Sequence, residues 1–235
     1  MSENLICKVL VGSRLHGTYR PDSDYDYRGI FISDLKTKLN PFIKQKTASW
    51  IEGNNDDTTY ELADFCRQAT KGNATILEVF FSDKIIETSD IHQEMRENWK
   101  KFFDTHNFVN ASRGYAHNQW NKFYNRDDIG EMNQNRTAKF ALSFLRVMWQ
   151  CEHFLKTGEF ECSLVNSDVF DLITNKIKGK TAEELKPYMP EIMTKMDELE
   201  RRVYEVWSTS EFRDMKPDYD WIADFIYRSY KKYDN

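Results

Sequence analysis

The chain has 235 residues, enough for one domain with a sizeable extension or for two small domains. It carries 33 basic and 38 acidic side chains, and this net charge of −5 excludes a protein that holds nucleic acid by bulk positive charge. Aromatic residues reach 14% while Gly and Pro are few (9 and 5), which favours a packed, helix-rich body over disorder.

The chain shows no sign of a membrane or secretory segment. No apolar run approaches the ~20 residues of a membrane span, and the opening MSENLICKVLVG is interrupted by Lys8 before it resembles a secretory leader. The four cysteines are scattered without a Cys-x-x-Cys pair, which predicts reduced, buried thiols. We therefore expect a cytoplasmic protein with no membrane partner.

The first part of the chain alternates short apolar runs with turn residues, as is typical of a small sheet. Residues 5–11 and 25–32 are predicted strands, joined by an irregular segment that contains Gly and Pro. Residues 34–53 are expected to form a loop, with a possible third strand near residues 47–52.

The hydrophobic period becomes helical from Glu61 onward. A helix that ends at a left-handed Gly72 is followed by a short helix over residues 74–81. Further helices are predicted at 90–104, 106–124, 133–157, 166–176, 181–207 and 217–232. The change of composition near Ser82 predicts an α+β protein, with a small mixed-sheet module at residues 1–82 and an all-helical domain at residues 83–235.

The segment VLVGSRLHGTYRPDSDYDYRGIF carries the most chemical information. The first strand ends in Gly12 and Ser13, and Asp24 and Asp26 follow after ten residues at the start of the next strand. Strand alternation places the two carboxylates on one side, where they repel each other unless a cation lies between them. Mg²⁺ prefers carboxylate and phosphate oxygens, and a glycine followed by a serine lets backbone and hydroxyl donors approach a phosphate. The pattern predicts a site for a metal-bound nucleoside triphosphate; the alternative is a surface Asp-x-Asp beside an ordinary turn.

Three motifs in this order resemble the RNA repair pathway DNA polymerase beta (RlaP-like) family, a branch of the DNA polymerase beta nucleotidyltransferase superfamily. The string GSRLHGTYRPDSDYDYRGIF resembles its first motif, KGNATILEVFF at residues 71–81 its second, and the helix at residues 137–160 its C-terminal helix. The resemblance implies a small mixed-sheet nucleotidyltransferase module and an all-helical domain that closes the cleft.

The resemblance also implies the roles of the motif residues. Gly12 and Ser13 would contact the triphosphate, and Asp24 and Asp26 would be catalytic carboxylates that hold two Mg²⁺ ions, with Mn²⁺ as a possible substitute. The superfamily adds a third carboxylate, which also acts as or assists the general base. Asp57 matches this position best.

The third carboxylate has alternatives. Asp56 and Glu61 compete with Asp57 for the role, and Asp57 itself also suits a turn or a helix cap.

The implied reaction moves a nucleoside monophosphate from a nucleoside triphosphate to an acceptor hydroxyl and releases pyrophosphate. The acceptor would be an RNA end, a protein or a small molecule. Two alternatives stay open: a catalytically quiet nucleotide sensor or partner-binding module that uses the same pocket, and a structural protein whose carboxylates are incidental.

A narrow polar line follows the otherwise apolar helix at residues 137–157. Its members recur at steps of three and four residues: Lys139, Ser143, Arg146, Gln150 and His153. A charge on a buried helix needs water, a partner or a ligand. We expect Lys139 and Arg146 to bind the triphosphate, a role that the resemblance also implies, and the alternative is a solvated face.

Other basic residues allow two interpretations each. Arg113 and His117 share a helical face with Trp120 and Tyr124, which fits either a nucleic-acid platform or core aromatics with a solvated edge. Arg14 suits either a phosphate contact or a local structural role.

Arg28 follows Asp26 in the second predicted strand. It suits either a pair with one of the motif carboxylates or a free surface position.

Overall fold

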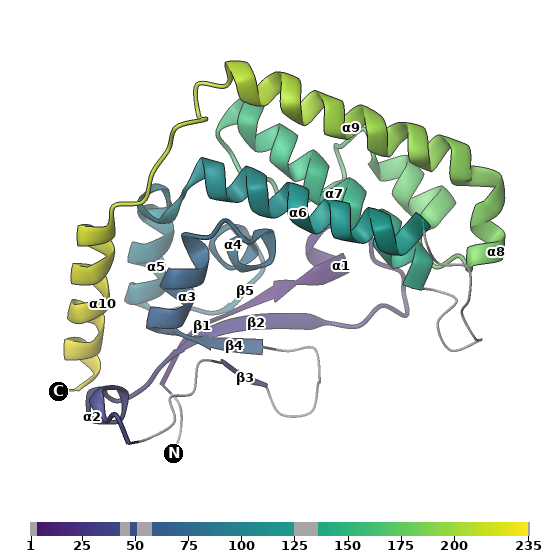
Figure 1. The fold of residues 1–235 in the computed structure, drawn as a ribbon. Coiled ribbons are helices and arrows are strands. Elements are labelled where there is room, and N and C mark those ends of the chain that lie inside the picture. The colour runs from purple at the N-terminus through teal and green to yellow at the C-terminus, as the bar shows by residue number, and fades with distance from the viewer. Residues whose placement is uncertain (1–3, 43–47, 51–57, 125–135, 235) are drawn as a thin grey trace. The chain divides into compact units, whose positions relative to one another are not determined.

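The computed structural model describes residues 4–42, 48–50, 58–124 and 136–234 (Figure 1). The chain forms two compact units. The first unit comprises Met1–Leu15, Tyr19–Asp104 and Met215–Asn235, and the second comprises His16–Thr18 and Thr105–Asp214.

The first unit is built on a mixed five-stranded sheet with strand order β3-β4-β2-β1-β5. Its strands are β1 (Asn4–Val11), β2 (Asp26–Ile32), β3 (Ala48–Trp50), β4 (Thr58–Glu61) and β5 (Ile85–Glu87). The β1 strand is antiparallel to β2 and β5, whereas β2 is parallel to β4 and β4 is antiparallel to β3. This sheet, with the helices that follow it, confirms the predicted α+β class.

All but one of the helices of the first unit bury apolar side chains, the exception being the short helix Leu35–Leu39. They are α1 (Gly12–Leu15), α2 (Leu35–Leu39), α3 (Leu62–Ala69), α4 (Ala74–Phe81), α5 (Asp90–Glu97), a 3-10 turn (Trp99–Phe102) and α10 (Tyr219–Tyr233). The predicted apolar stripe of α3 is buried throughout. Phe80 lies at the centre of an aromatic cluster, with its ring 5.4 Å from that of Phe65 and 5.2 Å from that of Phe102.

The second unit is helical, as predicted for the C-terminal part. Its elements are α6 (Thr105–Tyr124), α7 (Arg136–Thr157), a π-helix (Leu172–Ile177), α8 (Ala182–Leu185), a 3-10 turn (Lys186–Tyr188) and α9 (Met189–Thr209). The α7 helix packs against both α6 and α9 (Figure 1). Most of α7 is buried, which agrees with its apolar composition.

Three predicted helices differ from the structure. The helix expected at 90–104 is broken at Asn98, and the one expected at 181–207 is interrupted where two prolines enter the first turns of successive elements. Proline lacks the amide hydrogen that a continuous helix needs, so helices begin there. The helix expected at 166–176 forms as a π-helix that begins only at Leu172.

The compact units do not follow the division at residue 82. Residues 83–104 and the C-terminal helix α10 group with the sheet. The division into two domains at residue 82 stays a prediction.

The four cysteines are free and buried, as expected. Burial raises the pKa of the Cys7 and Cys151 thiols to about 12, so both are unreactive near neutral pH. Within the described ranges, none of the helices is both long and apolar enough to cross a membrane.

Candidate active site

The end of β1 and the start of β2 bring the two halves of the first motif together. Val11 pairs with Asp26 in the antiparallel register, and Gly12 follows with a positive φ of 69°. A Cβ atom built on Gly12 would lie 3.0 Å from Asp26 Cγ and closer still to Oδ2. The Gly12 backbone therefore lies directly against the Asp26 carboxylate, which only glycine permits.

The two motif carboxylates differ in setting. Asp26 is half-buried at the first position of β2, whereas Asp24 is exposed and precedes the strand. Asp24 thus lies just outside the regular alternation that the sequence predicted. No group of three or more His, Cys, Asp or Glu side chains suited to a metal ion occurs among the described residues. Asp57 and its competitor Asp56 lie outside the described residues.

Arg14 fixes the segment that carries Asp24. Its Nη2 atom donates to the Ser23 carbonyl at 2.8 Å, and its Nε atom is 3.3 Å from the Asp24 carbonyl. The guanidinium also lies 3.7 Å from the centre of the Tyr25 ring, a close cation–π contact. Of the two roles considered for Arg14, the structure shows the local structural one. The contact between Tyr25 and Arg14 was not predicted from the sequence. Strand alternation predicts only that Tyr25 lies on the face opposite the two carboxylates.

Arg28 has neither of the two settings considered for it. Its Nη1 atom donates to the Tyr60 hydroxyl at 3.0 Å, which joins β2 to the neighbouring strand β4. Its Nε atom is buried and has no hydrogen-bond partner in the described part of the chain. The observed partner of Arg28 is an uncharged phenol, whereas the charge of an arginine suggests a carboxylate partner.

Glu61, the third competitor for the metal site, serves another purpose. The parallel register places Glu61 opposite Phe31, about 16 Å along the strand from Asp26 at the usual rise. Its buried carboxylate accepts hydrogen bonds from Lys38 and from the Tyr230 hydroxyl. It also caps α3 through the Ala63 amide. These contacts make Glu61 a structural residue of the first unit.

The second motif lies on α4. Asn73 caps the helix by accepting from the Thr75 amide, and Glu78 is buried at 3% exposure. Lys71 is exposed just before the helix begins. The capping role of Asn73 explains why an asparagine stands there.

The polar line on α7 is partly buried. Lys139 is exposed, whereas Arg146 is 8% exposed and donates to Gln150 Oε1 at 3.2 Å. Gln150 in turn donates to the Glu161 carbonyl at 3.1 Å. The solvated-face interpretation therefore fails for Arg146. Triphosphate binding by Lys139 and Arg146 stays a prediction.

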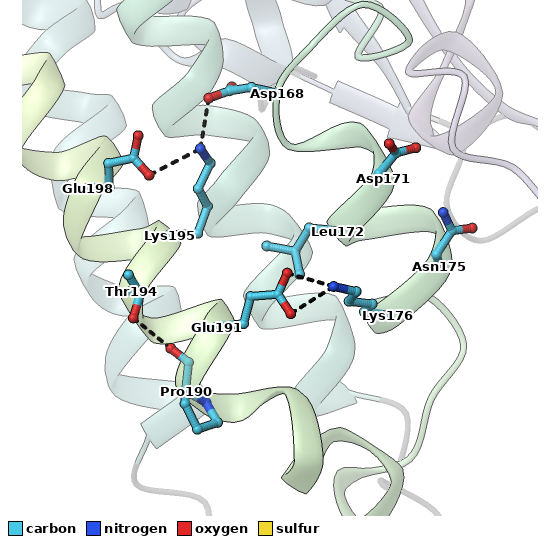
Figure 2. A pocket seen from close by; sticks show the side chains of 10 residues that line it. All are labelled: Asp168, Asp171, Leu172, Asn175, Lys176, Pro190, Glu191, Thr194, Lys195 and Glu198. Atoms are coloured by element: carbon cyan, nitrogen blue, oxygen red, sulfur yellow. Dashed lines mark hydrogen bonds and ion pairs between the residues drawn. The ribbon is translucent and has the colours of Figure 1, made fainter.

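A cavity of about 560 Å³ opens between the π-helix and α9 in the second unit (Figure 2). Lys195 Nζ lies 2.8 Å from Asp168 and 3.2 Å from Glu198, and Lys176 Nζ lies 2.7 Å from Glu191. Both lysines that line the cavity are already paired, so they are poorly suited to bind a triphosphate. We interpret this cavity as a structural groove held by ion pairs.

Comparisons with known proteins agree with the family resemblance of the sequence. The family model described as the RNA repair pathway DNA polymerase beta family matches residues 2–227. The uncharacterized protein MJ0002 of Methanocaldococcus jannaschii is 27% identical over 209 residues, which cover 81% of this chain and 82% of that protein. The name of this relative states no activity.

Proposed function

Because the chain belongs to the RNA repair pathway DNA polymerase beta family, we propose that it is a metal-dependent nucleotidyltransferase. It transfers a nucleoside monophosphate from a nucleoside triphosphate to an acceptor hydroxyl and releases pyrophosphate. The acceptor is an RNA end, a protein or a small molecule. The observation that supports this most is the contact between the Gly12 backbone and the Asp26 carboxylate.

The motif carboxylates fit a hard divalent cation. Asp24 and Asp26 supply oxygen ligands, and the absence of a side chain at Gly12 lets the Asp26 carboxylate lie against the backbone that follows β1. Asp57 is proposed as the third ligand. Mg²⁺ or Mn²⁺ bound there would stabilise negative charge on the attacking and leaving oxygens.

The chain's own residues position the triphosphate. The Ser13 hydroxyl and the neighbouring backbone amides donate to phosphate oxygens, and Arg14 holds the Asp24 segment in place through two carbonyls. We assign Lys139 and Arg146 to the neutralisation of triphosphate charge. These roles are positional and electrostatic, as phosphoryl transfer requires.

The reaction then needs one proton transfer. The acceptor oxygen forms a bond to the α-phosphorus while its proton passes to the Asp57 carboxylate. The bond from the α-phosphorus to the bridging oxygen breaks, and the electron pair leaves with pyrophosphate. No covalent enzyme intermediate is required.

Nucleotide binding and pyrophosphate release test this proposal. Each triphosphate is offered with Mg²⁺ or Mn²⁺, with pooled RNA or total protein as acceptor, to the wild type and to Asp24→Asn and Asp26→Asn. We expect each variant to lose about 100-fold or more of the turnover, because transition-state charge is no longer held. Asp22→Asn is the matched control, since Asp22 is an exposed carboxylate of the same loop.

The outcomes separate the candidate functions. Turnover that survives in both Asn variants would refute the transferase proposal. Metal-dependent binding without pyrophosphate release, with every acceptor, would favour the nucleotide sensor instead.

A further inference from the structure

The second unit contains a cavity of about 340 Å³ whose lining includes none of the residues proposed to bind the triphosphate. Its walls come from α6, α7 and α9. The volume lies near the lower end of the ~300–1,000 Å³ range of small-molecule sites, which suits a single ring system with a sugar. The cavity therefore has the size of a site for one small, compact ligand.

One wall of this cavity is aromatic. The Trp120 and Phe144 rings lie 5.9 Å apart with a tilt of 52°, and the buried Met148 side chain lies beside them in the lining. Trp120 is half-buried, and its ring is nearly parallel to that of Tyr124, at 5°. A planar, polarisable ring would stack favourably on such a wall.

A second wall offers hydrogen-bond acceptors. Asp197 and Glu200 lie one turn apart on α9, and neither forms an ion pair with any cation of the described ranges. The neighbouring cations on the same helix are all engaged elsewhere: Lys195 with Asp168, Arg201 with Glu205 and Arg202 with Glu152. The two carboxylates are therefore available to accept from a ligand.

Arg113 and Asn121 add donors to the lining. The Arg113 guanidinium packs 4.1 Å from the centre of the Tyr204 ring. Its Nε atom is buried and finds no hydrogen-bond partner in the described residues. Arginine and asparagine side chains both donate hydrogen bonds, so this part of the lining favours a ligand that supplies acceptors.

Charge narrows the ligand class. Asp197 and Glu200 outnumber Arg113 among the charged side chains of the lining, so they would repel an anionic group inside the cavity, and the phosphate of a nucleotide would have to lie outside it. An uncharged planar ring with donors on one edge and acceptors on another satisfies both walls. We propose that this cavity binds a nucleobase, with guanine as the best fit. Guanine presents N1–H and amino donors to a carboxylate, and its O6 and N7 atoms accept from arginine or asparagine.

Calorimetric titration of the full chain tests this proposal. The probes are the 5′-monophosphates of guanosine and uridine, together with single-stranded pentanucleotides of RNA that contain guanine or only uracil. We expect guanosine monophosphate to bind at least about tenfold more tightly than uridine monophosphate. Tighter binding of the guanine pentanucleotide than of the mononucleotide would identify RNA as the source of the base, and equal binding would identify a free nucleotide.

Substitutions of the lining residues test whether the ligand binds in this cavity. Asp197→Asn with Glu200→Gln is expected to weaken guanosine monophosphate binding by about tenfold or more, and Trp120→Leu to weaken binding of both bases. Asp171→Asn, which removes an exposed carboxylate from the other cavity, is the matched control and should bind as the wild type does. Equal affinity for the two bases, or an Asp197/Glu200 variant that binds like the control, would overturn the proposal. Dissociation constants weaker than about 1 mM for all four probes would also overturn it.

The test is separable from the transferase proposal. The titrations are made with EDTA present and repeated with Asp24→Asn/Asp26→Asn, which removes the proposed metal ligands. Binding that persists in this variant supports the cavity. If binding disappears there, the nucleotide occupies the motif site, and the cavity proposal fails while the transferase proposal stands.

Discussion

Gly12 combines a left-handed backbone conformation with a close contact to Asp26, and only glycine accommodates both. Its φ of 69° is left-handed, and a Cβ atom would overlap the Asp26 carboxylate. The left-handed conformation alone costs an L-residue about 1–2 kcal/mol. A side chain at this position would also displace Asp26, and we expect this displacement to weaken nucleotide binding.

Gly12→Ala should therefore lower both stability and nucleotide binding. We expect the free energy of unfolding to fall by about 1–3 kcal/mol and metal-dependent triphosphate binding to be lost. Urea denaturation and calorimetric titration measure the two effects.

Gly114→Ala is the matched control for this change. Gly114 lies inside α6, and a Cβ atom there would meet nothing within 4 Å. We expect it to raise the free energy of unfolding by up to about 1 kcal/mol through helix propensity, with binding unchanged. Similar effects of the two substitutions would contradict the geometry at Gly12.

Local sequence patterns predicted part of the candidate site. Successive strands that form an antiparallel pair bring a Gly-Ser turn beside the next strand's first carboxylate, so the proximity of Gly12 and Asp26 could be anticipated. The partners of Arg28 and Glu61 could not, because they lie 32 and 169 residues away in the chain. Such pairings depend on how the whole unit packs.

At the scale of elements, periodic segments were predicted well, including the short α4 helix, whereas two of the shortest elements were missed. The α6 and α7 helices lie close to their predicted positions. The edge strand β5 was missed because its three residues are all exposed, so they show no alternation of buried and exposed positions. The α2 helix was missed because only five residues form it and none is buried.

The α7 and α9 helices are held together by a buried ion pair. Arg202 on α9 donates through Nε to Glu152 on α7 at 2.8 Å, and Glu152 is only 2% exposed. The hydrogen bond from Arg202 to Glu152 holds the pKa of the guanidinium above its ordinary value. If Arg202 were removed, the buried Glu152 carboxylate would lose one of its two cationic partners and keep Lys156.

Arg202→Ala should lower the free energy of unfolding by about 2–3 kcal/mol. The expected loss is limited because Lys156 still pairs with Glu152. Arg201→Ala is the matched control, since Arg201 is exposed and pairs only with Glu205, at 2.5 Å, among the described residues. It should cost less than about 1 kcal/mol. Equal losses in urea denaturation would show that the Glu152 pair contributes no more than a surface pair does.

At the scale of the whole molecule, the two ends of the chain belong to one compact unit. The amide of Asp218, the N-cap of α10, donates to the Lys101 carbonyl at 2.9 Å, and the Trp221 ring lies 5.7 Å from that of Phe102. Amphipathic periodicity predicted the existence of α10 but carries no information on which surface it covers. The sequence therefore assigned this helix to the helical domain, whereas the structure groups it with the sheet.

Tyr230 gives α10 a polar contact inside the first unit. Its hydroxyl donates to the buried Glu61 carboxylate, which is also contacted by Lys38. Burial and the bond to Glu61 raise the pKa of the Tyr230 hydroxyl, so it remains a neutral donor across the physiological range. Loss of this donor would leave a carboxylate oxygen in the core without its partner.

Tyr230→Phe should therefore lower the free energy of unfolding by about 1–3 kcal/mol, because an unpaired buried acceptor is costly. Tyr227→Phe on the same helix is the control, since Tyr227 is 62% exposed and its change should stay within about 0.5 kcal/mol. Urea denaturation of both variants measures the difference. If the two changes have the same effect, the hydrogen bond between Tyr230 and Glu61 adds nothing measurable to the stability of the first unit.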